Sequence, residues 1–148
     1  MAKWTTRLTE REVRVLVGSA YGVSSPVKTF FETLYIEADL SAGQMLVLPN
    51  ADERGIYVAS GEVCIAEMPV KAHQMAILAD RKEVSITANS AARIALIGGQ
   101  GIGKRYMEWN FVSSRKERIE QAKQDWQQRR FAKVPGDEEE FIPYPTVD

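Results

Sequence analysis

The sequence has 148 residues, of which 45% are hydrophobic and 26% charged, and this composition is typical of one globular domain with one core. The formal net charge of −1 provides no electrostatic attraction to nucleic acid or to an anionic membrane, so neither is an expected partner. No apolar run approaches the ~20 residues that span a bilayer, and the N-terminus lacks the apolar core of a signal peptide. Cys64 is the only cysteine, which excludes an internal disulfide and favours a reducing cytoplasm.

Between Glu12 and Gly98 the chain consists of short runs of strand-forming residues separated by turn residues. Strands this closely spaced, without helices between them, predict an antiparallel β-sandwich or a small barrel. The predicted strands are Glu12–Val17, Thr29–Leu40 (one bent strand or two), Gln44–Leu48, Gly55–Ala59, Glu62–Glu67, Met75–Leu78, Val84–Thr87 and Arg93–Ile97.

One helix is expected in the C-terminal third of the chain. Ser114 and Glu117 have the spacing of a capping box, in which each side chain satisfies a free backbone donor at the helix start. The helix is expected to end before Pro135, with Arg129 and Arg130 near its negative end. An apolar stripe at helical spacing is formed by Ile119, Ala122 and Trp126.

The same third carries large aromatic side chains that are too apolar to lie free in water. Each of them buries roughly 150–250 Å² when it is covered, so this segment is expected to dock on the body of the domain. The residues assigned to this structural docking of helix and tail are Trp109, Asn110, Phe111, Trp126 and Phe131.

Several short motifs follow one another along the chain. They are Gly18–Gly22, Ser25–Thr29, Tyr57–Val63, Leu96–Gly99, Trp109–Ser114, Trp126–Phe131 and Val134–Asp137. In this order they resemble the C-terminal domain of the pirin family, and the resemblance extends from about Val13 to Pro145. Pirins are usually two-domain cupin proteins, and this chain resembles their second domain alone.

The resemblance implies a mostly β fold, a cupin-type antiparallel β-sandwich or barrel with one C-terminal α-helix. Residues 1–148 are then one domain, with an N-terminal arm (1–11), a β-barrel (12–98), and a loop, helix and docked tail (99–148). The Met1 start and the C-terminal motif favour a natural one-domain relative over a fragment of a longer protein.

In metal-dependent cupins, including the first domain of pirins, several His residues and one Glu hold the ion. Such a site needs imidazole donors that converge at about 2.0–2.2 Å. This chain has one histidine, His73, which is expected at the surface or in a turn, and the segment Pro49–Glu53 carries none. No metal, other cofactor or catalytic residue is therefore predicted, and Glu53 is kept as a candidate polar group of the cavity.

Two further motifs are similar to functional sites but are predicted to be structural. Gly98–Lys104 matches the opening of a phosphate-binding loop, but Arg105 stands where a Ser or Thr hydroxyl must reach Mg²⁺, so a turn is predicted. Cys64 is expected on a half-buried strand, and together with His73 it is interpreted as a core thiol and an exposed imidazole rather than a catalytic pair.

The function indicated by these observations is that of a non-catalytic, pirin-like binding or scaffolding module without its own metal site. Two alternatives stay open: a component of a pirin-type quercetin-cleaving dioxygenase whose metal comes from another chain, and a metal-free sensor of an unidentified small molecule. The expected partner is a second copy of the chain or a separate His-rich cupin chain. In a homodimer, Trp4–Leu8 or Phe141–Pro145 could cross to the other subunit.

Overall fold

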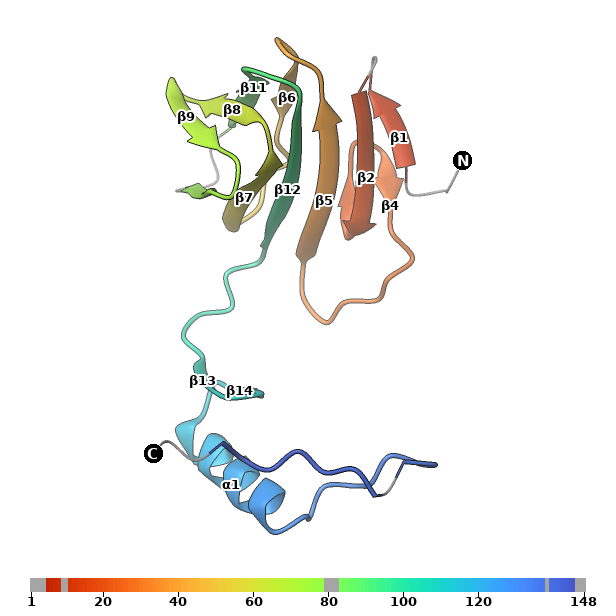
Figure 1. Ribbon diagram of the computed structural model, residues 1–148, viewed down its shortest axis with the longest axis vertical. Helices are drawn as coiled ribbons and strands as arrows, with labels where there is room; N and C mark the ends of the chain where they lie inside the picture. Colours follow the sequence, from red (N-terminus) through yellow and green to blue (C-terminus); the bar gives the residue numbers. More distant parts are fainter. Residues whose placement is uncertain (1–4, 9–10, 79–82, 138, 146–148) are drawn as a thin grey trace. The chain divides into compact units, whose positions relative to one another are not determined.

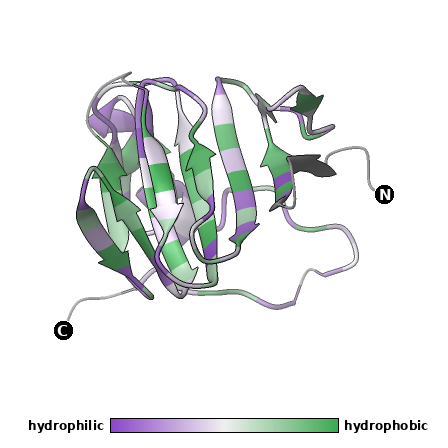
Figure 2. Ribbon diagram, turned by 90° about the horizontal axis from the view of Figure 1, so that it is seen from above, coloured by the Kyte–Doolittle hydropathy of each residue, from purple (hydrophilic) through white to green (hydrophobic). Residues whose placement is uncertain are grey.

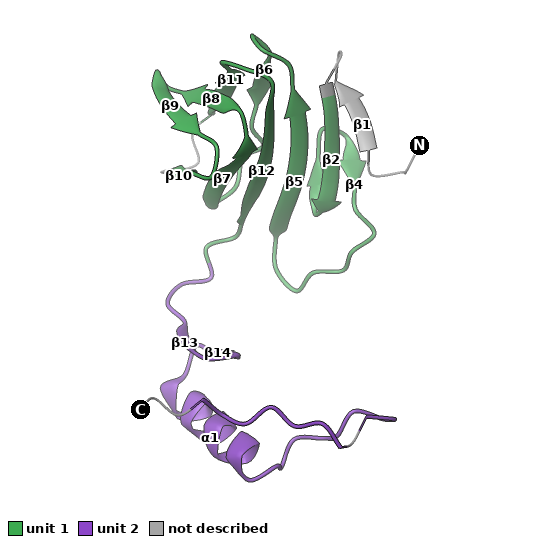
Figure 3. Ribbon diagram, viewed as in Figure 1, with its two compact units in different colours: residues 1–101 green, residues 102–148 purple. Residues whose placement is uncertain are grey.

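The computed structural model describes residues 5–8, 11–78, 83–137 and 139–145, and side chains from residue 12 onward within these ranges. The chain divides into two compact units, Met1–Gly101 and Ile102–Asp148 (Figures 1 and 3). This boundary lies close to the predicted division between the barrel (12–98) and the loop, helix and tail (99–148). The docking of the tail on the barrel stays a prediction.

The first unit contains two large antiparallel sheets. One has six strands in the order β1-β2-β5-β12-β7-β10, and the other has four in the order β6-β11-β8-β9. Their bounds are β1 Thr5–Leu8, β2 Arg11–Val17, β5 Thr33–Leu40, β6 Met45–Val47, β7 Glu53–Ser60, β8 Glu62–Ile65, β9 Met68–Lys71, β10 Met75–Leu78, β11 Ser85–Ala88 and β12 Ala92–Gly99. A small hairpin pairs β3 (Ser19–Ala20) with β4 (Val23–Ser24).

Alternation of side chains places the core between the sheets. In β5 every second residue is buried, from Leu34 to Leu40, because successive side chains of a strand point to opposite faces. Figure 2 shows the corresponding hydrophobic and hydrophilic bands along the strands. The inner faces of the two sheets supply Val13, Val15, Leu34, Ile36, Ala38, Leu40, Leu46, Ile56, Val58, Val63, Ile65, Val70, Ile86, Ala88, Ile94 and Leu96. The predicted antiparallel sandwich is confirmed.

Several element boundaries differ from the sequence-based prediction. The predicted strand Thr29–Leu40 begins only at Thr33, because the residues before it form a loop in which Phe30 and Phe31 are exposed. Strands β3, β4 and β9 were not predicted, since they are short and contain little apolar alternation. Thr5–Leu8 of the expected N-terminal arm forms β1 and pairs with β2 of the same chain. Trp4 lies outside the described residues.

The second unit comprises the hairpin β13 (Tyr106–Glu108) and β14 (Phe111–Ser113), the helix α1 (Lys116–Gln127) and the segment that follows it. Hairpin β13–β14 was not predicted.

The capping-box prediction is wrong: the N-cap residue is Arg115, and no side chain caps the helix there. Ser114 is not the cap because the backbone stays extended through Arg115, with φ −122° and ψ 126°. No helix within the described ranges has the length and apolar character needed to cross a membrane.

The helix also ends earlier than predicted. After Gln127, Arg129 adopts a left-handed conformation with φ +54°. Its N–H donates to the carbonyl of Trp126, and the N–H of Arg130 donates to that of Asp125. These two bonds form a Schellman motif, which commonly ends a helix at a glycine. Here arginine occupies that position, so Arg129 and Arg130 lie beyond the helix rather than in its last turn.

Candidate functional site

The interior of the sandwich, where the resemblance would place a metal site, is lined by aliphatic side chains. Strands β5, β7 and β12 contribute Ile36, Ile56 and Leu96 from the large sheet, each no more than 1% exposed. The small sheet contributes buried residues such as Val63 and Ile86. Hydrocarbon side chains supply neither a metal ligand nor a proton donor. This interior therefore provides packing rather than coordination.

Glu53 and Arg54 begin strand β7 and differ in environment. The side chain of Glu53 is exposed, whereas Arg54 is only 3% exposed and is the one buried charged residue among those whose burial the structure describes. Nη1 of Arg54 donates a hydrogen bond to the carbonyl of Pro49, at 3.1 Å. Sequence reasoning selected Glu53 and missed Arg54. The alternation that buries Ile56 and Val58 on the same strand was the signal for the buried arginine.

Two glycines end strand β12, and the first of them, Gly98, leaves the space that Arg54 occupies. Gly98 pairs with Arg54 in the sheet register, and a Cβ atom at Gly98 would lie 3.1 Å from Cγ of Arg54 and 2.7 Å from the carbonyl oxygen of Glu53. At Gly99 a Cβ would lie 2.2 Å from the carbonyl oxygen of Glu32. The Leu96–Gly99 motif thus ends in two residues whose missing side chains let neighbouring backbones approach closely.

The sequence Gly98–Lys104 leads into strand β13, not into the helix that a phosphate-binding loop requires.

His73 lies in an exposed turn with φ +67°, and its Nδ1 atom is 3.3 Å from the hydroxyl of Tyr57. The prediction of an exposed turn histidine is confirmed. Cys64 is half-buried on β8, opposite Pro69 of β9 and Thr87 of β11. Within the described part of the chain, no three His, Cys, Asp or Glu residues are grouped to hold a metal ion. The residues present do not fit a cupin metal centre.

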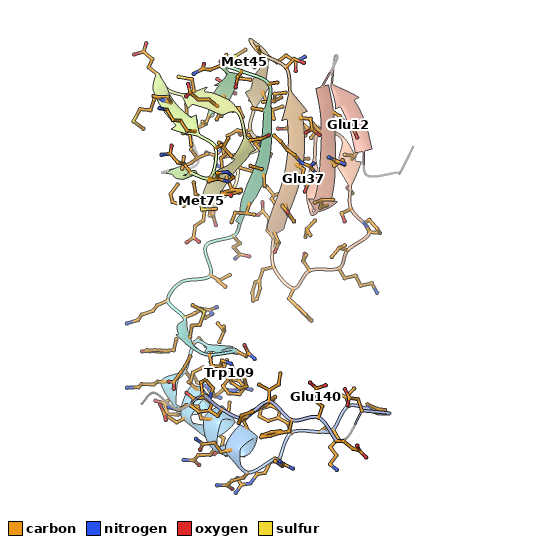
Figure 4. The ribbon with its side chains drawn as sticks, in the orientation of Figure 1. Glu12, Glu37, Met45, Met75, Trp109 and Glu140 are labelled. Atoms are coloured by element: carbon orange, nitrogen blue, oxygen red, sulfur yellow. The ribbon has the colours of Figure 1, made fainter. Side chains whose placement is uncertain are left out.

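The aromatic residues of the second unit pack against one another. Trp109 meets Phe111 and Trp126 edge to face, with ring centroids 5.6 and 5.0 Å apart. Phe131 stacks on Phe111 at 5.9 Å. Asn110, the remaining residue assigned to docking, is exposed in the turn between β13 and β14. Four of the five predicted docking residues are therefore gathered in one cluster, labelled at Trp109 in Figure 4.

Polar contacts next to the aromatic cluster connect strand β13, helix α1 and the segment after the helix. Nζ of Lys123 lies 2.7 Å from Oε1 of Glu108, and the hydroxyl of Tyr144 donates a hydrogen bond to the same oxygen. Nε1 of Trp126 donates to the carbonyl of Ile142, at 2.8 Å. Hydrogen bonds from Lys123 and Tyr144 lower the pKa of Glu108, while the bonds to Glu108 raise the pKa values of both partners. Hairpin, helix and tail are thereby joined in one unit. Lys123 and Glu108 are distant in sequence, and only the fold brings them together.

The two-sheet sandwich defines the class of protein. Its fold is that of the cupins. It superposes on a crystal structure of quercetin 2,3-dioxygenase from Acinetobacter baumannii with a TM-score of 0.79 at 21% identity. The match covers 97% of this chain and 50% of that one. A structure from Geobacillus kaustophilus matches with a TM-score of 0.62 at 22% identity, over 68% of this chain and 44% of that one. At such identities the likeness concerns the fold alone.

The family follows from the sequence comparisons. Residues 35–132 match the model of the pirin C-terminal cupin domain, and the chain belongs to the pirin family. It is 38% identical over 135 residues to a pirin-like protein of Caulobacter vibrioides, covering 90% of this chain and 47% of that protein. It is 25% identical over 127 residues to a putative quercetin 2,3-dioxygenase of Pseudomonas aeruginosa, covering 83% and 44%. The chain thus spans about half the length of these relatives.

Proposed function

We propose that this chain is a non-catalytic pirin-type cupin module that binds or scaffolds another protein and has no metal site of its own. The observation that carries the proposal is the aliphatic interior of the sandwich, formed by residues such as Ile36, Ile56 and Leu96. An active cupin centre needs converging imidazole and carboxylate donors at this place. The single histidine supports the same conclusion, because it lies in an exposed turn.

Elemental analysis of protein purified without an affinity tag tests this proposal. We expect iron, nickel and manganese far below one equivalent per chain. The informative variant is Glu53→Ala, and Glu83→Ala, which removes an exposed carboxylate elsewhere, is its control. One equivalent of metal per chain that is lost in Glu53→Ala and kept in Glu83→Ala would contradict the proposal.

A second candidate function is that of a component of a quercetin-cleaving dioxygenase whose metal is held by another chain. It is supported by the likeness to the putative quercetin 2,3-dioxygenase of Pseudomonas aeruginosa, of which this chain covers 44%. Its test is quercetin consumption by this chain alone, by a separate His-rich cupin chain with its metal, and by the two together. Activity that requires both chains favours this candidate over the scaffold. Activity of the His-rich chain that this chain does not change argues against it.

The third interpretation, a metal-free sensor, would use the interior of the barrel. Buried side chains of both sheets, such as Leu46 and Ile94, occupy that interior, which does not favour a ligand there. The expected partners remain a second copy of the chain or a His-rich cupin chain, and the expected location remains the cytoplasm.

A further inference from the structure

The outer face of the six-stranded sheet carries exposed apolar side chains next to strand β10. In the sheet register Ile77 lies beside Gly55, Gly55 beside Ile97, and Ile97 beside Tyr35, while Met75 lies beside Tyr57. Ile77 is 76% exposed and Met75 49%. We call the following set the apolar face: Tyr35, Tyr57, Met75, Ile77 and Ile97.

Gly55 makes this surface continuous across the strands. A Cβ atom at Gly55 would lie 3.3 Å from Cδ1 of Ile77 and 3.8 Å from Sδ of Met75. Both side chains therefore lie across β7, where a larger residue would push them away. The apolar face extends in this way from β10 over β7 and β12 to β5.

An ionic border adjoins the apolar face on strands β2, β5 and β12. Nη2 of Arg14 lies 3.4 Å from Oε2 of Glu37 and 3.2 Å from Oδ2 of Asp39, and Nη2 of Arg93 lies 3.0 Å from Oε2 of Glu37. Figure 4 labels Glu37 on β5 and Met75 on β10, which belong to the border and to the apolar face respectively. An apolar centre with two Tyr and one Met beside a polar border with Arg has features of a protein–protein interface.

Strand β10 is an edge of the six-stranded sheet, and its own four residues include neither lysine nor proline. Natural sheets guard their edges with lysine, proline or very short strands. Edge strand β9 contains Pro69 and Lys71, and edge strand β6 has only three residues. Strand β10 reads Met-Ala-Ile-Leu, and within the described residues it pairs with β7 on one side only. An apolar face that extends to such an edge strand is expected to be covered by a binding partner.

We propose that the cover is a second copy of this chain, packed with the outer face of its six-stranded sheet against the same face of the first. This inference rests on the proposed binding role and specifies its surface. At about 150–250 Å² for each large side chain, the exposed parts of the apolar face amount to roughly 350–600 Å². With the ionic border this approaches the ~800 Å² per partner of a standard interface.

The charges favour a second copy over an unlike partner. The border holds Arg14 and Arg93 together with Glu37 and Asp39, so it carries both signs within one patch. A two-fold axis brings a patch against itself, and a patch of mixed sign can then match its arginines with the carboxylates of the other copy. A border of one sign would repel its own copy.

The mass of the protein at micromolar concentration, measured by light scattering or sedimentation, tests the proposal. The informative variant is Ile77→Lys with Ile97→Lys, and the matched control is Met45→Lys on β6, which is 51% exposed on the other sheet. We expect two chains per particle for the unmodified protein and for the control, and one chain for the double variant. A one-chain mass of the unmodified protein overturns the inference. A double variant that stays dimeric while keeping its far-ultraviolet circular dichroism overturns the choice of surface and leaves the binding role standing.

Hydrogen exchange of the unmodified protein provides a test that needs no folded variant. Dilution should release the interface, so amides of β10 are expected to exchange at least severalfold faster at low than at high concentration. Amides of β6 serve as the internal control and should exchange at the same rate throughout. Exchange in β10 that does not depend on concentration, in a sample shown to change from dimer to monomer, overturns the proposed surface.

Discussion

Nζ of Lys123 lies 2.7 Å from Oε1 of Glu108, so the middle of helix α1 is joined to strand β13 by an ion pair. The hydroxyl of Tyr144 donates to the same carboxylate oxygen and ties the chain after the helix to this pair. Glu120 contributes a second carboxylate, 3.4 Å from Lys123. These contacts hold three segments that are distant in sequence within one unit.

The stability of the second unit is expected to depend on pH at both ends of the scale. Bonds from Lys123 and Tyr144 hold the pKa of Glu108 below its ordinary value of 4.5, so its contribution is present above pH 4.5 and is lost as the pH falls through the lowered pKa. The bond to Glu108 raises the pKa of Lys123 above 10.5 and that of Tyr144 above 10.0. Their contributions are present below those values and are lost as the pH rises through the raised pKa values. Near-ultraviolet circular dichroism of the aromatic cluster should therefore be constant between these limits and fall on either side.

Glu108→Gln tests whether the carboxylate of Glu108 produces this profile. Glutamine keeps an acceptor for Tyr144 but has no carboxylate to protonate. We expect the acid limb of the profile to become shallower or to shift. The alkaline limb should weaken as well, because the raised pKa values of Lys123 and Tyr144 depend on the carboxylate of Glu108. An acid limb identical to that of the unmodified protein would show that another group titrates there.

Trp126→Ala is expected to loosen the second unit. Its ring packs on Trp109 and Phe131, and its Nε1 donates to the carbonyl of Ile142. The loss is expected near 3 kcal/mol, the low end for a truncated tryptophan, because the ring is half-buried. Trp126→Phe keeps an aromatic ring and removes the donor, so a loss of ~1 kcal/mol is expected. Hydrogen exchange of the amides of α1 measures both, and equal protection in all three proteins would refute the role of this residue.

The sheets were predictable because alternation is a local signal. Strand β5 is buried at every second position from Leu34 to Leu40, and the sequence shows that pattern directly. The start of α1 was not predictable from its capping motif, since β14 keeps the backbone extended through Ser113. The amide of Arg115 then bonds to the hydroxyl of Ser113, so the helix begins two residues later than Ser114. Its end lacked the usual glycine signal because Arg129 takes the left-handed position.

The residues of the candidate site could also be predicted from the sequence only in part. Composition predicts that His73 alone is too few for a cupin metal centre, because such a site needs several imidazole donors, and the absence of a metal stays a prediction. Choosing between Glu53 and Arg54 required the alternation of Ile56 and Val58 to be extended back beyond the predicted strand start at Gly55, because a shift of one residue exchanges the buried and exposed faces. The apolar face could not be predicted from the sequence either, because Tyr35, Ile77 and Ile97 become neighbours only through the order of strands in the sheet.

Arg54→Ala should destabilise the first unit. The change removes a buried side chain and the donor to the carbonyl of Pro49, so a loss of about 3 kcal/mol is expected. Glu53→Ala is the matched control, because the neighbouring side chain is exposed, and its effect should stay within about 0.5 kcal/mol. Chemical denaturation followed by far-ultraviolet circular dichroism compares the two. A loss for Arg54→Ala that also stays within about 0.5 kcal/mol would contradict the prediction.

Gly98→Ala tests the close packing of β12 on β7. The new Cβ atom would meet the carbonyl oxygen of Glu53 at 2.7 Å, and since this is a backbone atom the two strands must move apart. We expect a loss of about 1–3 kcal/mol and a lower melting temperature. Gly101→Ala is the control: its Cβ atom would come no closer than 3.4 Å to Oε1 of Glu53, the end of a flexible side chain, so a change within about 0.5 kcal/mol is expected. A Gly98→Ala protein that melts at the same temperature as the Gly101→Ala control would show that the two strands yield freely at this position.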